Sequence, residues 1–462
     1  RILFISIKLP IHHRIMESLR IILFSVFCFG MAITLKAERV DMLKSGAKAD
    51  GKTLNTMLIN HTVDRLSQAG GGTLFFPAGT YLTGAIRLKS NITLELEAGA
   101  TLLFSDNFDD YLPFMEVRHE GVMMKSFSPL ISAMDAENIT IKGEGTLDGQ
   151  GKAWWTEFFR IYVDLEKNGM RELNKYQPLW ERENDVEALY AETNEDWHGT
   201  LKRRFFRPPF IQPVRCRRVR IEGVKIINSP FWTVNPEFCD NVVVTGVTIH
   251  NVPSPNTDGI NPESCRNVHV SDCHISVGDD CITLKSGRDA QARRLGVPCE
   301  NITITNCTML SGHGGVVIGS EMSGSVRKVT ISNCVFDGTD RGIRIKSTRG
   351  RGGVVEDIRV SNIIMSNIKR EAVVLNLKYS EMPVEPMSER TPLFRDISIS
   401  GLTAVGVKTP VKIVGLEEAP VTDIILRDIN VKNAREKCIF ENCERIRLTD
   451  VIVNGKEVRL EE

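Results

Sequence analysis

A short phrase recurs along the second half of the chain and constrains the fold more than any other feature. Each copy opens with a turn residue and continues with alternating apolar residues, as in 239–249, 265–275 and 299–309. The starts of these copies are 26 and 34 residues apart. Alternation with a period of two indicates short β-strands, and no long stretch has the period of a helix. Further copies begin near residues 326, 355, 394, 421 and 443.

A unit of this length cannot bury its own apolar face, so neighbouring units must stack. Short strands stacked in this way predict an all-β fold, a right-handed parallel β-helix. A propeller would need about 40 or more residues in every blade, and the leucine-rich phrase is absent. A helix expected from about Thr56 to Ala69 would cap the first coil and cover its unpaired strand edges. The earliest coils are expected at 74–82, 92–103 and 139–147.

The repeat is interrupted between about 151 and 210, where mixed charges precede a basic run. We interpret this stretch as an insertion from one coil, partly helical, within a single β-helix domain at 38–462. Its aromatic residues would either stack on a ligand or pack into the core, and the sequence leaves both open. The tryptophans of the insertion are Trp154, Trp155, Trp180 and Trp197.

The first 37 residues have the layout of upstream sequence followed by a secretion signal. Met16–Arg20 precedes an apolar run from Ile21 to Leu35, and cleavage is expected near Ala37. A membrane anchor is the alternative, but the run is shorter than the roughly 20 residues that cross a bilayer. We therefore expect no membrane span in the mature chain. Its expected location is the periplasm, the cell surface or the medium.

Charge and cysteine content exclude several classes of function. Acidic and basic residues balance at 58 each, so no global field attracts nucleic acid or an anionic membrane. A charged polymer would have to bind at a local patch. There are eleven cysteines and no C-x-x-C pair, so no zinc site is expected. Two columns of structural cysteines are expected, as either disulfides or stacked thiols: Cys239, Cys265 and Cys299, and Cys273, Cys307 and Cys334.

Four polar segments follow one another at spacings of 21, 34 and 31 residues, about one coil each. Residues one coil apart are stacked in a β-helix, so all four segments should fall on one face. Each segment alone is an ordinary turn or strand sequence, and only their register makes them a candidate site. In chain order, the segments carry Asn256 with Asp258, Asp279 with Asp280, His313, and Arg344 with Lys346.

The residue types in these segments suit the hydrolysis of an acidic glycoside. That reaction needs a protonated carboxyl for the leaving oxygen and a carboxylate that activates water or attacks the sugar. Three neighbouring aspartates cannot all ionise easily, so at least one pKa must rise. His313 can orient one of them. Arg344 and Lys346 flank an apolar residue and should point to one side, where they could hold a sugar carboxylate.

The motifs N-T-D, D-D, G-H-G and R-I-K occur in this order without substitution. In this the chain resembles the polygalacturonase-like pectin hydrolases, glycoside hydrolase family 28, over most of 40–460. The resemblance implies inverting cleavage of α-1,4-galacturonosidic bonds in pectin-derived poly- or oligogalacturonides, without metal or cofactor. It also implies roles for individual residues. Asp279 would be the acid, with His313 supporting its protonation, and Asp258 and Asp280 would activate water. Asn256, Arg344 and Lys346 would bind substrate.

Several alternatives remain open at this point. The insertion could close one end of the cleft and make the enzyme exo-acting. The substrate, an acidic plant cell-wall polysaccharide or oligosaccharide, could instead have a rhamnogalacturonan or xylogalacturonan backbone. A calcium-dependent pectate lyase is a further rival, although Arg344 and Lys346 would repel a cation beside the aspartates. The last rival is a β-helix that binds polysaccharide without cleaving it.

Overall fold

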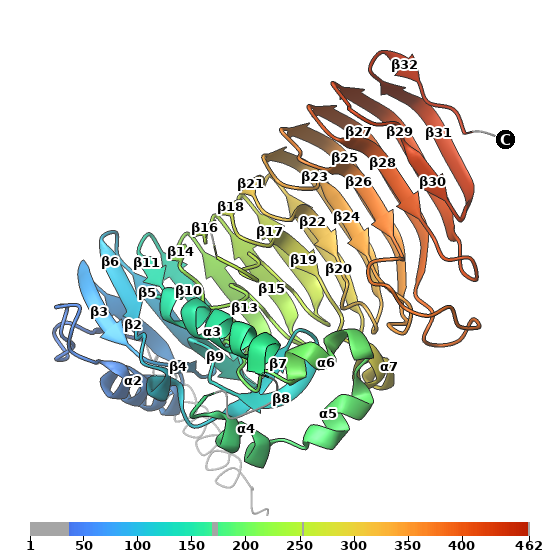
Figure 1. Cartoon of the computed structure of the whole chain (residues 1–462). Coiled ribbons are helices and arrows are strands. Elements are labelled where there is room, and N and C mark those ends of the chain that lie inside the picture. Colours follow the sequence, from blue (N-terminus) through green and yellow to red (C-terminus); the bar gives the residue numbers. More distant parts are fainter. Residues whose placement is uncertain (1–36, 169–173, 252–253, 461–462) are drawn as a thin grey trace, which may run out of the picture. The chain divides into compact units, whose positions relative to one another are not determined.

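The computed structural model describes residues 37–168, 174–251 and 254–460, so the predicted signal sequence lies outside them except for Ala37. Residues 39–462 group into one compact unit, and Figure 1 shows its strands stacked as successive rungs. Pairings between coils are parallel, as the predicted β-helix requires. The largest sheet contains β1 (Glu38–Asp41), β2 (Gly72–Phe76), β3 (Gly79–Thr83), β5 (Ile92–Leu96), β6 (Ala100–Phe104), β10 (Glu137–Gly143), β11 (Thr146–Asp148), β13 (Arg217–Glu222), β14 (Lys225–Ile227), β15 (Asp240–Thr245), β16 (Thr248–His250), β17 (Arg266–Ser271), β18 (His274–Ser276), β20 (Cys299–Thr305), β21 (Thr308–Ser311), β23 (Val326–Asp337), β25 (Val354–Ser366), β27 (Leu393–Val405), β29 (Val421–Lys432), β31 (Cys443–Val453) and β32 (Lys456–Glu457).

The remaining side of each coil carries the candidate residues. It begins with one three-stranded sheet and continues through isolated bridges, Ile211 to Val234 to Ile260 to Ile282, into a six-stranded sheet. The three-stranded sheet contains β4 (Ile86–Leu88), β9 (Ile131–Met134) and β12 (Ile211–Val214). The six-stranded sheet contains β19 (Asp280–Leu284), β22 (Gly314–Ile318), β24 (Ile343–Lys346), β26 (Glu371–Asn376), β28 (Thr409–Val414) and β30 (Ile439–Glu441).

Each repeat bends just before the column formed by Cys273, Cys307 and Cys334. This bend explains why an Asp or Asn directly precedes each of these cysteines. Asp272, Asn306, Asn333 and Asn362 all adopt left-handed φ angles between 55° and 59°. Asn and Asp tolerate this conformation better than other residues with a Cβ. Successive copies touch, because the side-chain amide nitrogen of Asn362 donates a hydrogen bond to the side-chain oxygen Oδ1 of Asn333 at 2.7 Å. All ten described cysteines are free, so the columns are thiols and not disulfides.

Helix α2 (Thr56–Gln68) covers the first coil, as predicted. Ile59, Val63 and Leu66 share one face of the helix and are completely buried. Burying each such side chain contributes roughly 1.5–3 kcal/mol. The helix therefore shields the apolar interior that the first coil would otherwise expose.

The expected insertion contains four helices beside the coils, shown in green in Figure 1. They are α3 (Lys152–Asn168), α4 (Gln177–Glu183), α5 (Val186–Glu192) and α6 (Glu195–Leu201). Trp154, Trp180 and Trp197 are at most 2% exposed. These three therefore pack inside, and stacking on a ligand through their ring faces is ruled out for them. The other short elements are the hairpin β7 (Met115–His119) and β8 (Val122–Ser126), the 3₁₀ helix η1 (Phe108–Tyr111) and α7 (Asp289–Leu295).

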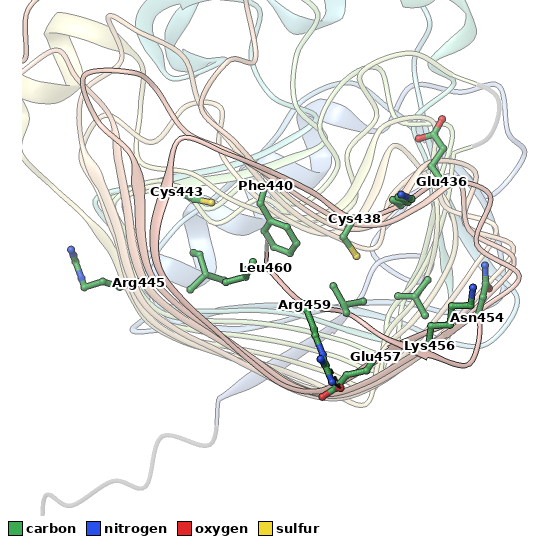
Figure 2. A pocket seen from close by; sticks show the side chains of 14 residues that line it. Glu436, Cys438, Phe440, Cys443, Arg445, Asn454, Lys456, Glu457, Arg459 and Leu460 are labelled. Carbon is green, nitrogen blue, oxygen red and sulfur yellow. Dashed lines mark hydrogen bonds and ion pairs between the residues drawn. The ribbon is translucent and has the colours of Figure 1, made fainter. Parts of the chain in front are cut away.

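The last coil that the structure describes encloses a hollow of about 860 Å³. Figure 2 shows Phe440, Cys438 and Leu460 inside the outline of this coil and Arg445 pointing away from it. None of the candidate site residues predicted from the sequence lines this hollow. No helix among the residues placed by the structure is long and apolar enough to cross a membrane.

Candidate active site

The strand register on the remaining side of each coil, which carries the candidate residues, brings the aspartate segments together. The backbone N–H of Gly259 donates to the Asp280 carbonyl, and Asp280 pairs with Gly314 in the next coil. His313, one residue earlier, donates its backbone N–H to the Asp279 carbonyl at 2.8 Å. The prediction that Asp258, the aspartate pair and His313 stack is therefore confirmed.

The two cations lie on the same face as the aspartates, as predicted, but at a different position along their strand. In the register of the sheet Arg344 lies opposite Val317, three positions beyond Gly314. Arg344 and Lys346 still reach the aspartates, because their side chains are long enough to span the offset. The repeat spacing alone could not reveal this shift along the strand.

The three aspartates form a compact, mostly buried cluster. One carboxylate oxygen from each of Asp258, Asp279 and Asp280 lies within 4.8 Å of the others. Asp258 is 2% exposed and accepts a hydrogen bond from the Asn261 amide at 2.9 Å. Burial, followed by the charge of Asp279, raises the pKa of Asp258 well above its usual value. The cluster therefore retains a proton at a pH where isolated aspartates would have lost theirs.

Asp280 is the ionised member of the cluster. Lys346 Nζ lies 2.8 Å from Asp280 Oδ2, and Arg344 Nη1 lies 3.2 Å from Oδ1. Burial disfavours the carboxylate, but the charges of Lys346 and then Arg344 outweigh it and lower the pKa of Asp280 to about 2. The two cations were expected to point to one side, where they could hold a sugar carboxylate. They are instead 7–8% exposed and already engaged by a carboxylate.

Asp279 is the accessible member, with 18% of its side chain exposed. Its Oδ1 lies 3.1 Å from His313 Nδ1 and also accepts the backbone N–H of Asp280 at 3.0 Å. The hydrogen bond to Asp279 raises the pKa of His313 against the opposing effect of burial. His313 is half-exposed. Of the three aspartates, Asp279 is therefore the one most accessible to a ligand.

Asn256 stands at the edge of the same pocket, in a left-handed conformation with φ near 50°. Its Oδ1 accepts a hydrogen bond from Arg207 Nη2 at 2.8 Å. Burial lowers the pKa of Arg207 to about 9. Arg207 therefore fixes the orientation of the Asn256 amide, whose nitrogen remains available to a ligand.

A buried ion-pair network beside the cluster was missed from the sequence. Lys285 Nζ lies 2.6 Å from Glu321 Oε2 and 4.5 Å from the ring centre of Trp232. Burial opposes the charge of Lys285, but Glu321 and then Asp258 outweigh it and raise its pKa. Arg288 holds the other oxygen of Glu321 at 2.6 Å. The only signal in the sequence was a lysine closing the largely apolar strand that follows the aspartate pair.

The insertion and the β7–β8 hairpin wall one end of the pocket. Asp196, Trp197 and Thr200 of α6 line the same hollow as the three aspartates, which has a volume of about 270 Å³. Trp197 Nε1 donates to Glu120 Oε2 at the hairpin tip. This volume is just below the roughly 300–1,000 Å³ that is usual for small-molecule sites. Glu120 and the α6 residues bound this hollow on the side of the insertion.

The donor set is poorly suited to a calcium ion. Three carboxylates this close could supply oxygen ligands, and calcium takes six to eight. Both oxygens of Asp280, however, already accept hydrogen bonds from cationic side chains. Lys285 adds a third positive charge next to Asp258. The positive charge that balances the cluster thus comes from the protein itself.

Comparison with known proteins points to one group of enzymes. Residues 195–451 match the family model described as glycosyl hydrolases family 28. A probable polygalacturonase from Vitis vinifera is 30% identical over 87% of this chain and 75% of its own length. An exo-poly-alpha-D-galacturonosidase from Dickeya chrysanthemi is 29% identical over 74% of this chain and 57% of its own. The crystal structure of a hyperthermoactive exopolygalacturonase from Thermotoga maritima superposes with a TM-score of 0.80, at 36% identity, over 91% of this chain and 93% of that one.

Proposed function

The chain belongs to glycosyl hydrolases family 28, and we propose that it hydrolyses α-1,4-galacturonosidic bonds in pectin-derived poly- or oligogalacturonides. One observation carries the proposal: a cluster of three buried or half-buried aspartates lies directly beside a cationic pair. A glycosidase needs an acid and a base together, and a uronic acid substrate needs a positive partner. The similarity to enzymes named for galacturonan supports the same substrate.

In the proposed mechanism Asp279 donates its proton to the leaving oxygen, because it is the aspartate that a substrate can reach. His313 holds and orients Asp279 through the 3.1 Å contact. Asp258 and Asp280 position the attacking water. The proton that burial places on Asp258 is available to its neighbour, since the reactive oxygens lie within 4.8 Å.

Substrate binding is assigned to the polar residues around the aspartates. Arg344 and Lys346 hold the galacturonate carboxylate on their outer side while keeping Asp280 ionised on their inner side. Asn256 donates its amide to a substrate hydroxyl from the orientation set by Arg207. Each contact uses a group that is already in place, so little ordering is needed on binding.

The proposed stereochemical outcome is inversion, although the spacing of the carboxylates is unusual for it. Inverting pairs are commonly roughly 6.5–9.5 Å apart and retaining pairs roughly 5–5.5 Å; the oxygens here are closer. Retention would require one carboxylate to bond to the sugar. Asp258 and Asp280 are only 1–2% exposed, and Asp280 is held by two cations. Water reaches such buried groups more readily than a sugar ring does, which favours inversion.

We also propose exo action, with one sugar released per cleavage. The support is the wall formed by α6 and the hairpin, which leaves about 270 Å³ beside the aspartates. A continuous polymer would need an open cleft on both sides of the cut. On polygalacturonate, free galacturonate should appear from the first minutes while viscosity falls slowly. A ladder of oligomers with a rapid fall in viscosity would contradict exo action.

Product analysis separates the proposed function from its rivals. Wild-type enzyme should release reducing ends from polygalacturonate and oligogalacturonides but not from rhamnogalacturonan or xylogalacturonan. A lyase would instead give an unsaturated product whose ultraviolet absorbance EDTA abolishes. A non-catalytic β-helix would release no reducing ends and would behave identically after Asp279→Asn.

Export to the periplasm, cell surface or medium is part of the proposal, since pectic substrates lie outside the cell. Its support is the apolar run from Ile21 to Leu35 behind a basic residue. N-terminal sequencing of the protein from its native host should find a mature start near residue 38. A start at or before Met16 would contradict cleavage.

A further inference from the structure

A second hollow, of about 230 Å³, continues from the candidate pocket on the side away from α6. Lys346 and Tyr379 line both hollows, so the two are contiguous. Tyr379 is 43% exposed, and its ring centre lies 5.2 Å from Lys346 Nζ. An exposed aromatic ring at such a junction offers an apolar surface to a bound ligand.

The strand register places further cations along this second hollow. Arg344 pairs with Val374 in the next coil, and Val374 pairs with Lys412 in the coil after that. Two coil spacings separate Arg344 from Lys412, roughly 10 Å. Arg370 stands immediately before β26, in the coil between them.

The lining of the second hollow carries an excess of positive charge. It contains five cationic side chains and one carboxylate, that of Glu371, which pairs with Arg341 at 2.9 Å. Burial, followed by the charge of Arg344, lowers the pKa of Arg341, as crowding of like charges should. In the part of the chain that the structure describes, no carboxylate lies within ion-pair distance of Arg370 or Lys412. Arg370 is exposed and Lys412 is half-buried.

We propose that Arg370 and Lys412 form a second uronate subsite, which binds the carboxylate of the next sugar beyond the one held by Arg344 and Lys346. This inference rests on the proposed function and deepens it. The pocket beside α6 takes the sugar to be released. Arg344 and Lys346 hold the carboxylate of the second sugar, on the leaving side of the cleaved bond. The third sugar then lies beyond Tyr379, at the second subsite. A substrate long enough to reach the second subsite gains an ionic contact that a disaccharide lacks.

The test is the ratio of kcat/KM on trigalacturonate to kcat/KM on digalacturonate. The double variant Arg370→Gln/Lys412→Gln should lower this ratio about tenfold. In wild-type enzyme, raising the salt concentration should lower the ratio toward that of the variant, because both cations are accessible to solvent. The matched control is Arg427→Gln/Lys432→Gln, which removes two exposed cations of β29 in the large sheet. Its ratio should equal that of wild type.

A second measurement makes the test independent of turnover. In the Asp279→Asn background, the double variant should reduce the preference in Kd for trigalacturonate over digalacturonate by a similar factor. An unchanged ratio in both measurements would overturn the second subsite while leaving hydrolysis of galacturonides intact. If wild-type enzyme cleaved neither oligosaccharide, the proposed function would fail and the subsite with it. Thermal melting identifies any variant that has lost its fold.

Discussion

Replacing Asp279 with asparagine tests the assignment of the general acid. Asparagine has nearly the same shape, and its Oδ1 can still accept the backbone N–H of Asp280, now 3.0 Å away. The surrounding turn should therefore persist, and the change is confined to the loss of an ionisable proton. General acid catalysis contributes typically 10²–10⁴-fold, which corresponds to about 3–5 kcal/mol of transition-state stabilisation.

The assay compares two leaving groups. On digalacturonate, Asp279→Asn should lower kcat/KM by about 10²–10⁴-fold, because the departing sugar oxygen needs a proton. On an aryl galacturonide with an acidic phenol, the loss should be less than about tenfold, because this group leaves without protonation. Asp258→Asn is the control: it acts on the water and should impair both substrates alike. Equal losses of Asp279→Asn on the two substrates would refute its role as the acid.

Two further predictions follow from the charges and the tight packing around the aspartates. Lys346→Gln removes the strongest attraction on the Asp280 carboxylate, so the pKa of Asp280 should rise from about 2. The acidic limb of the pH profile of kcat/KM should then move to higher pH. An unmoved limb would show that Asp280 does not control it. In Gly278→Ala, the new Cβ would lie 1.6 Å from the Ser254 carbonyl oxygen, so the turn before the aspartate pair must shift, with a loss in kcat of about 10²-fold. Gly199→Ala in α6 meets no atom within 4 Å and should change stability by at most about 1 kcal/mol in thermal melting; equal effects of the two alanines would contradict the packing explanation.

The fold was predictable because one physical constraint governs the whole chain. Alternating apolar residues in units too short to bury themselves leave stacking as the only way to form a core. The same register placed Asp258, Asp279 and His313 together, since each lies in a turn or at a strand start that recurs in every coil. The capping helix was predictable too, because Ile59, Val63 and Leu66 fall on one helical face.

The sequence could not reveal contacts set by side-chain length or by the insertion. Arg344 lies three positions off the register of the aspartates and reaches them only through its long side chain. Lys285 and Glu321 are 36 residues apart and meet because a loop returns to the cluster. Trp197 belongs to a segment with no repeat, so nothing in the coil spacing placed it beside the pocket. Such residues follow from tertiary packing and not from periodicity.

Time-resolved ¹H NMR of trigalacturonate digestion by wild-type enzyme tests the central claim most directly. It follows the identity of the products and the anomeric form of each newly formed reducing end before mutarotation. We predict galacturonate and digalacturonate as the first products, with the new reducing end initially in the β form, as inversion of an α bond by water requires. A new reducing end that first appears in the α form, or an unsaturated product, would contradict direct attack by water at this cluster of aspartates.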